Sequence, residues 1–183
     1  MPYGICHIAL APIRAQASDT SEMVSQILFG ETLKILETQN QWCKVRIQFD
    51  QYIGWMDEKQ FISLNEDEFE NANNIVKVNN HLFLKASSKE RDLTLPLGAS
   101  LPGLKADSFS IKEEFISLSK KVNTDILSIE KLIKVALSLK ETPYLWGGRS
   151  PMGIDCSGFT QLIYKCVGIS INRDAKDQAD QGK

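Results

Sequence analysis

The spacing of apolar residues changes near residue 123 of this 183-residue chain, and that change constrains the fold most. Before it, short apolar runs are separated by turn-forming residues, and Trp42–Ile47 alternates apolar and polar side chains like a strand with one wet face. After it, apolar residues recur at helical spacing over 129–137 and again over 159–167. The sequence therefore predicts an α+β chain, with a β-rich N-terminal part followed by helices.

Two β modules are predicted, at residues 1–64 and 72–122, followed by a helical segment at 124–183. The second module is indicated by a weak repeat, in which Leu95–Leu101 aligns with Ile27–Leu33. One irregular β domain of about 120 residues is the alternative. The acidic stretch Asn65–Glu70 and the Asn-rich residues after it have the composition of a linker between the modules.

The charge balance of 21 basic and 23 acidic residues argues against a protein that binds nucleic acid or an anionic membrane, because such binding needs clustered basic residues. No apolar run approaches the roughly 20 residues that span a bilayer. The N-terminus also lacks a charged leader before an apolar core. We therefore expect a cytoplasmic chain with no membrane span and no nucleic-acid partner. The four cysteines form no C-x-x-C pair, so neither a zinc site nor another cofactor is expected.

The two C-terminal cysteines occupy different places on the second predicted helix. Cys166 falls on the apolar stripe, which predicts a buried and inert side chain. Cys156 lies in the first turn, where unpaired backbone N–H groups and the helix dipole favour an anion and therefore a reactive thiolate. Position alone leaves a core residue or a weak helix cap as alternatives for Cys156.

The residues around Cys156 give it a specific interpretation. Pro-Tyr-x-Trp-Gly-Gly at 143–148 and Asp-Cys-Ser-Gly-Phe at 155–159 resemble the signature of the NlpC-type cell-wall cysteine peptidases. The N-terminal part resembles the bacterial SH3-like domain that often accompanies this peptidase, in the segments Gly30-Glu31, Trp42–Val45 and Gly54-Trp55. With the weak repeat, the chain resembles the murein-peptide recycling branch, which is similar to dipeptidyl-peptidase VI. The resemblance implies two small SH3-like β-barrels followed by the N-terminal helical part of a papain-like catalytic domain.

The resemblance also implies a reaction, the hydrolysis of the γ-D-glutamyl–diamino acid bond in a peptidoglycan stem peptide with a free N-terminal L-alanine. Cys156 would be the nucleophile, and its backbone N–H and the Tyr144 hydroxyl would hold the oxyanion. Asp155 would accept a hydrogen bond from the substrate ammonium group, and Ser157 would orient the substrate through its hydroxyl. No metal or cofactor takes part in this reaction.

Three further residues match family positions near the cleft. Glu31 and Tyr52 correspond to the wall that closes one end of it, where a carboxylate facing a buried ammonium ion gives charge-assisted recognition. An ordinary turn carboxylate and a barrel aromatic are the alternatives for these two residues. Arg173 lies in a segment whose family counterpart is a loop that approaches the cleft. We expect Arg173 to be a solvated surface residue. The alternative is that it pairs with a carboxylate of the substrate.

The chain departs from the family pattern in its histidines. The family's general base is a histidine on a strand well beyond the nucleophile, whereas His7 and His81 both precede Cys156. We expect a truncated piece of a longer peptidase, which as this chain hydrolyses its substrate poorly or not at all. The alternatives are a binding module for cell-wall peptides with a vestigial peptidase segment, and a cysteine-based transferase or amidase on the same scaffold.

Overall fold

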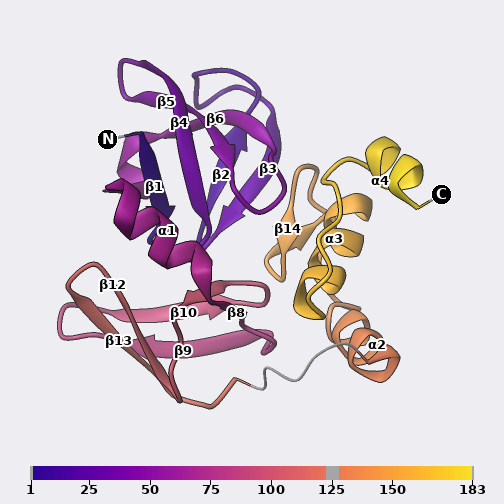
Figure 1. Ribbon diagram of the computed structural model, residues 1–183. Coiled ribbons are helices and arrows are strands. Elements are labelled where there is room, and N and C mark those ends of the chain that lie inside the picture. Colours follow the sequence, from indigo (N-terminus) through magenta and orange to yellow (C-terminus); the bar gives the residue numbers. More distant parts are fainter. Residues whose placement is uncertain (1, 123–127, 183) are drawn as a thin grey trace.

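The computed structural model describes residues 2–122 and 128–182, which are mostly β with four α-helices (Figure 1). Two β layers lie one above the other, and the orange-to-yellow C-terminal helices stand to one side of both (Figure 1). The strands of the N-terminal layer are β1 (Tyr3–Cys6), β2 (Leu10–Arg14), β3 (Met23–Leu28), β4 (Thr32–Gln39), β5 (Trp42–Ile47), β6 (Ile53–Asp57) and β7 (Phe61–Leu64). The strands of the second layer are β8 (Val76–Val78), β9 (Phe83–Ser87), β10 (Asp92–Pro96), β11 (Ser100–Pro102), β12 (Ser108–Ile111) and β13 (Glu114–Leu118).

The N-terminal sheet is antiparallel, with the strand order β3-β2-β6-β5-β4-β1-β7. The alternation predicted for Trp42–Ile47 is confirmed over its second half, because Val45 and Ile47 are fully buried while Lys44 and Arg46, which alternate with them, are half-buried. The pairings of the described residues leave β3 and β7 as the two edges, so no closed barrel is found. The predicted pair of closed SH3-like barrels is therefore not confirmed.

The second layer repeats one turn of the first. Gly30 and Gly98 both adopt a left-handed backbone, with φ of 74° and 84°. The N–H of Gly30 donates to the carbonyl of Cys6, and the N–H of Gly98 donates in the same way to the carbonyl of Asn79. A side chain at Gly30 would place its Cβ 1.9 Å from the carbonyl oxygen of Ser100, so only glycine fits between the two layers. The weak repeat in the sequence thus corresponds to a shared turn geometry.

The segment predicted to be a linker is a helix, α1 (Glu66–Asn74), so that prediction was wrong. Asn65 and Glu68 form a reciprocal capping box, in which each side chain accepts a hydrogen bond from the other residue's backbone N–H. Phe69 buries its ring in the apolar core and stacks on Tyr3 at a centroid distance of 4.3 Å. The cap and this aromatic anchor outweigh the acidic composition of the segment.

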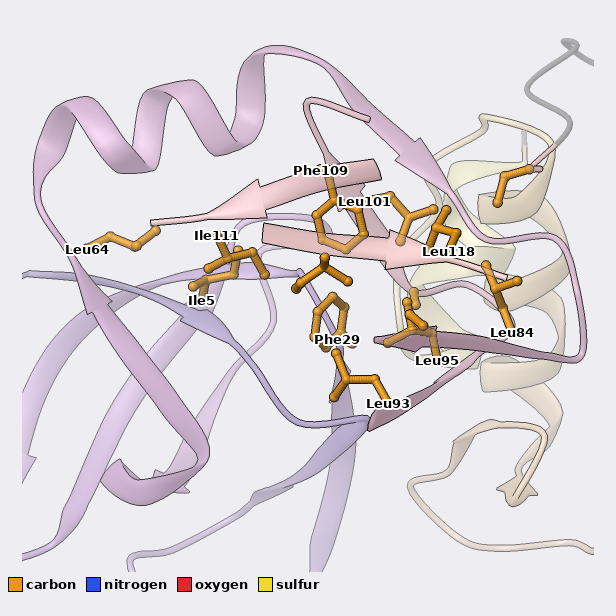
Figure 2. Packing of buried hydrophobic residues seen from close by; sticks show 14 of the residues in the cluster. Ile5, Phe29, Leu64, Leu84, Leu93, Leu95, Leu101, Phe109, Ile111 and Leu118 are labelled. Carbon is orange, nitrogen blue, oxygen red and sulfur yellow. The ribbon is translucent and has the colours of Figure 1, made fainter. Parts of the chain in front are cut away.

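Phe29 inserts from the N-terminal layer into the core of the second layer. Its ring is fully buried and meets Phe109 edge-on at a centroid distance of 6.1 Å. Figure 2 shows Phe29 between Leu93 and Phe109, with Ile5 lying in the same cluster. The carbonyl of Phe29 also accepts a hydrogen bond from the N–H of Ser100. The two predicted β modules therefore share one apolar core.

The C-terminal elements are α2 (Ile129–Ser138), the hairpin β14 (Arg149–Ser150) and β15 (Gly153–Ile154), α3 (Cys156–Cys166) and α4 (Ala175–Gln181). Ser128 caps α2, and Gly168 follows the end of α3 with a φ of 84°. Leu162 of α3 is buried in a cluster that includes Leu28 of β3 and Leu97. The N-terminal part of the chain therefore covers the apolar side of α3. Among the described helices, none is long and apolar enough to cross a bilayer.

Candidate active site

Cys156 is the first residue of α3, and its side chain is exposed. The other three cysteines, Cys6, Cys43 and Cys166, are buried, which confirms the prediction for Cys166. Burial raises the pKa of the Cys166 thiol to about 12, so this thiol is inert at neutral pH. The structure thus presents one cysteine to solvent, at a helix start where backbone N–H groups point outward.

Asp155 caps α3 and is surrounded by donors from the protein itself. Its carboxylate accepts hydrogen bonds from the backbone N–H groups of Gly158 at 2.7 Å and Gly147 at 2.9 Å. The guanidinium of Arg173 donates to both carboxylate oxygens, at 3.1 and 2.7 Å. Partial burial raises the pKa of the Asp155 carboxyl, but the hydrogen bonds from Arg173 and Gly158 outweigh burial and hold that pKa below its usual range.

Ser157 belongs to the same cluster. Its hydroxyl donates to the Asp155 carboxylate at 3.2 Å and accepts a hydrogen bond from Arg173 at 2.9 Å. Gln178 of α4 donates to the Ser157 carbonyl at 2.9 Å. Both residues that flank Cys156 are therefore held by contacts inside the protein, and their predicted contacts with substrate remain predictions.

Tyr144 and Trp146 lie on the loop that precedes the β14–β15 hairpin and Cys156, and they are 67% and 62% exposed. Tyr144 forms a β-bridge with Ile154, two residues before Cys156. The Trp146 indole donates to the Glu22 carboxylate at 2.6 Å. Gly147, with a φ of 76°, permits this loop to pass close to Met23, whose carbonyl oxygen would lie 2.2 Å from an added Cβ. The loop therefore presents exposed aromatic side chains, and Tyr144 pairs with the strand that leads into Cys156.

Glu31 lies in a different, fully buried cluster. It is 2% exposed, and its carboxylate binds Arg149 at 2.8 Å and also contacts the ammonium of Lys165. The backbone N–H of Leu28 donates to the second carboxylate oxygen at 2.7 Å. Burial raises the pKa of Glu31, but Arg149 and Lys165 outweigh it and keep the pKa below its usual range. In this structure the carboxylate has cationic partners within the protein, and recognition of a substrate ammonium by Glu31 stays a prediction.

Tyr52 is half-buried and faces the segment that carries Arg173. Burial raises the pKa of the Tyr52 phenol to about 12, and the hydrogen bond to the Asp174 carboxylate adds to the effect. Because Arg173 binds Asp155, Tyr52 lies near the segment that holds the residue before Cys156. The backbone N–H of Tyr52 also donates to the Asp50 carboxylate at 3.0 Å, and that carboxylate lies 3.8 Å from Arg149. Asp50 therefore links Tyr52 to the buried cluster around Glu31.

Arg173 is buried, at 3% exposed, so the prediction of a solvated surface residue was wrong. Its charge is compensated by Asp155, which makes burial of the guanidinium possible. Arg149 and Lys165 were not identified as site-region residues from the sequence. No sequence signal distinguishes these buried cations from solvated ones, because their partner Glu31 is more than 100 residues away in the chain.

The two histidines lie in the β layers. His7 is half-buried, and its pKa is lowered by burial and by the nearby Arg91. The His81 ring nitrogen Nε2 lies 3.1 Å from the carbonyl oxygen of Lys121. Neither contact includes Cys156 or its neighbours.

Two family models match parts of the chain. Residues 13–61 match the bacterial dipeptidyl-peptidase SH3 domain, and residues 141–183, which include Cys156, match the NlpC/P60 family. The second match assigns residues 141–183 to the NlpC/P60 family. The N-terminal sheet of the chain is the SH3 domain that the resemblance implies, and its exposed cysteine lies in the matched NlpC/P60 segment.

Several of the relatives to which this chain is similar are named dipeptidyl-peptidases. The chain is 33% identical to the γ-D-glutamyl-L-lysine dipeptidyl-peptidase of Bacillus subtilis, across 87% of this chain and 58% of the relative. It is 28% identical to the Bacillus cereus protein of the same name, across 90% of this chain and 56% of the relative. The chain thus spans somewhat over half the length of these two relatives.

Solved structures share the fold. The crystal structure of an NlpC/P60 family protein from Bacillus cereus has a TM-score of 0.80 at 22% identity, covering 97% of this chain and 76% of that one. An NlpC/P60 endopeptidase from Photobacterium damselae has a TM-score of 0.79 at 16% identity, covering 97% of this chain and 45% of that one. At these identities the likeness supports the arrangement of the β layers and helices.

Proposed function

We propose that this chain carries the SH3 domain and the nucleophile of a cysteine peptidase that cleaves peptidoglycan stem peptides during murein peptide recycling in the cytoplasm. The bond cleaved is the one between γ-D-glutamate and the diamino acid, in peptides with a free N-terminal L-alanine. The observation that carries the proposal is the exposed Cys156 at the start of α3, beside the capping residue Asp155. The names of the two Bacillus relatives support the choice of bond.

The proposed chemistry begins at the Cys156 sulfur. Its thiolate attacks the γ-carbonyl carbon, a C–S bond forms, and negative charge develops on the carbonyl oxygen. The backbone N–H of Cys156 and the exposed Tyr144 hydroxyl are the proposed donors to that oxygen. The C–N bond then breaks, the amine of the diamino acid leaves with a proton, and water hydrolyses the thioester.

We assign recognition of the free L-alanine ammonium to the region near Tyr52, beside the first turn of α3 that carries Cys156. The Asp174 carboxylate accepts the Tyr52 hydrogen bond, and Asp155 lies on the other side of Arg173. We assign the ammonium to the neighbourhood of these two carboxylates, because carboxylates favour a cationic ligand. Blocking the amine by acetylation removes the charge that this recognition would use.

Peptide binding tests this recognition without requiring turnover. We expect the Cys156→Ala chain to bind L-Ala-γ-D-Glu-L-Lys about tenfold to a hundredfold more tightly than its N-acetylated form, because a hydrogen bond to a charged group contributes roughly 1.5–3 kcal/mol. Isothermal titration calorimetry with both peptides measures the ratio. Equal affinities would contradict recognition of the free amine, and no binding of either peptide would contradict the proposed substrate.

Product analysis separates the peptidase from a binding module. The unmodified chain is expected to release L-Ala-γ-D-Glu slowly, because His7 and His81 both lie in the β layers. Mass spectrometry of the digest identifies the bond cut, and the Cys156→Ala chain is the matched control. Slow release of L-Ala-γ-D-Glu that disappears in Cys156→Ala would favour the peptidase over the module that binds cell-wall peptides, whereas rapid turnover would contradict the expected role of a histidine base.

A further inference from the structure

Arg173 joins three segments of the chain through one buried guanidinium group. It binds Asp155 through two nitrogens, at 3.1 and 2.7 Å, and donates to the Ser157 hydroxyl at 2.9 Å. It also donates to the Ser25 hydroxyl on β3 at 3.2 Å and approaches the carbonyl of Gly148 at 3.5 Å. A single side chain thus contacts the SH3 domain, the loop before the hairpin and both neighbours of Cys156.

We propose that Arg173 is a positioning residue for the nucleophile, which it serves by fixing and neutralising Asp155. This inference rests on the proposed role of Cys156. Arg173 does not contact Cys156 itself, so it acts through the residues on either side. Its contacts orient the first turn of α3, and its positive charge offsets the Asp155 carboxylate one residue away from the sulfur.

The electrostatic part of the argument follows from the charges near the sulfur. A carboxylate without a partner beside Cys156 would repel the thiolate and so reduce the fraction of the reactive form. Arg173 is 3% exposed and pairs with Asp155 at 2.7 Å, so bulk water screens this pair weakly. The buried guanidinium therefore makes an acidic helix cap compatible with an anionic nucleophile.

The geometric part depends on the planar fork of arginine. Two parallel N–H bonds fix the plane of the Asp155 carboxylate, and the Ser157 contact fixes the backbone on the other side of Cys156. A lysine ammonium would supply the charge as a single point and would not hold both oxygens in one plane. The contact with Ser25 places this fork against the SH3 domain, so that domain helps to set the nucleophile turn.

Alkylation of Cys156 by iodoacetamide, followed by mass spectrometry at pH 7, tests the proposal in the full chain. For Arg173→Ala we expect the alkylation rate to fall at least about threefold, as one uncompensated charge nearby predicts. Guanidinium chloride, at concentrations that leave the thermal unfolding curve unchanged, should restore much of the rate. Urea is the matched additive, because it has a similar planar shape but carries no charge. Equal rates in Arg173→Ala and wild type, or equal effects of urea and guanidinium, would overturn the proposal.

Two further variants keep the test decisive. Arg173→Lys retains a positive charge and serves as the test if Arg173→Ala fails to fold. We expect its alkylation rate to lie between those of wild type and Arg173→Ala. A wild-type rate in Arg173→Lys would overturn the role of the fork. Arg91→Ala removes an arginine that pairs with Glu114 on the second layer, and it should leave the rate unchanged. Because alkylation needs no peptide, failure of the proposed peptidase function would leave this result intact.

Discussion

Replacing Glu31 with alanine is expected to lower the free energy of unfolding by about 3–5 kcal/mol, the cost of breaking a buried ion pair by removing one partner. The substitution leaves the Arg149 guanidinium and the Lys165 ammonium buried together without their shared anion. Urea unfolding followed by circular dichroism measures the change. Glu114→Ala is the matched control, because its pair with Arg91 is partly solvated and should contribute only about 1 kcal/mol.

The pH dependence of unfolding gives a second view of the same ion cluster. The pKa of Glu31 is lower in the folded protein than its ordinary value of 4.5, because Arg149 and Lys165 outweigh burial. Its stabilising contribution is therefore complete above 4.5 and is lost as the pH falls through the folded pKa. The stability difference between wild type and Glu31→Gln should shrink over that acidic range. A loss of less than about 1 kcal/mol in the free energy of unfolding for Glu31→Ala would contradict this account. If the same variant also showed a smaller difference in affinity between the free and N-acetylated peptides, the result would support the predicted role of Glu31 in substrate recognition.

Replacing Phe29 with alanine is expected to cost about 3–5 kcal/mol, the range for removing a fully buried aromatic side chain. The cavity would open in the core that joins the two β layers, beside Phe109. Differential scanning calorimetry should still show both layers unfolding in one transition, at a lower temperature.

Phe115→Ala is the matched control for Phe29→Ala. Phe115 is the same residue type on the second layer, but 59% of its surface is exposed, so its replacement should change stability by no more than about 0.5 kcal/mol. Similar effects of the two substitutions would contradict the shared core. Two separate transitions in the wild-type protein would contradict it as well.

Local patterns in the sequence predict many of the secondary-structure elements. Trp42–Ile47 is a strand with the predicted bounds, since alternation of apolar and polar residues acts over a few positions. The helix that begins at Cys156 is also predicted, and its stripe is buried at Leu162. The helix at Glu66–Asn74 was missed, although the Asn65 and Glu68 spacing of a capping box was present in the sequence.

Contacts between distant segments could not be predicted in this way. The partners of Glu31 are Arg149 and Lys165, and periodicity carries no information about which charges meet after folding. Arg173 has the composition of a surface residue and becomes buried only because Asp155 compensates it. The sequence therefore predicted that a helix begins at Cys156, whereas the surrounding buried ion pairs required the three-dimensional structure.

The central claim is that Cys156 is presented to substrate at the start of α3 while the other three cysteines are enclosed. Alkylation of the folded chain with iodoacetamide at neutral pH, followed by peptide mapping, tests this claim most directly. We predict one adduct, on Cys156, and slower formation of that adduct in the presence of L-Ala-γ-D-Glu-L-Lys. An unmodified Cys156 in the folded protein, or modification that the peptide does not slow, would contradict the account.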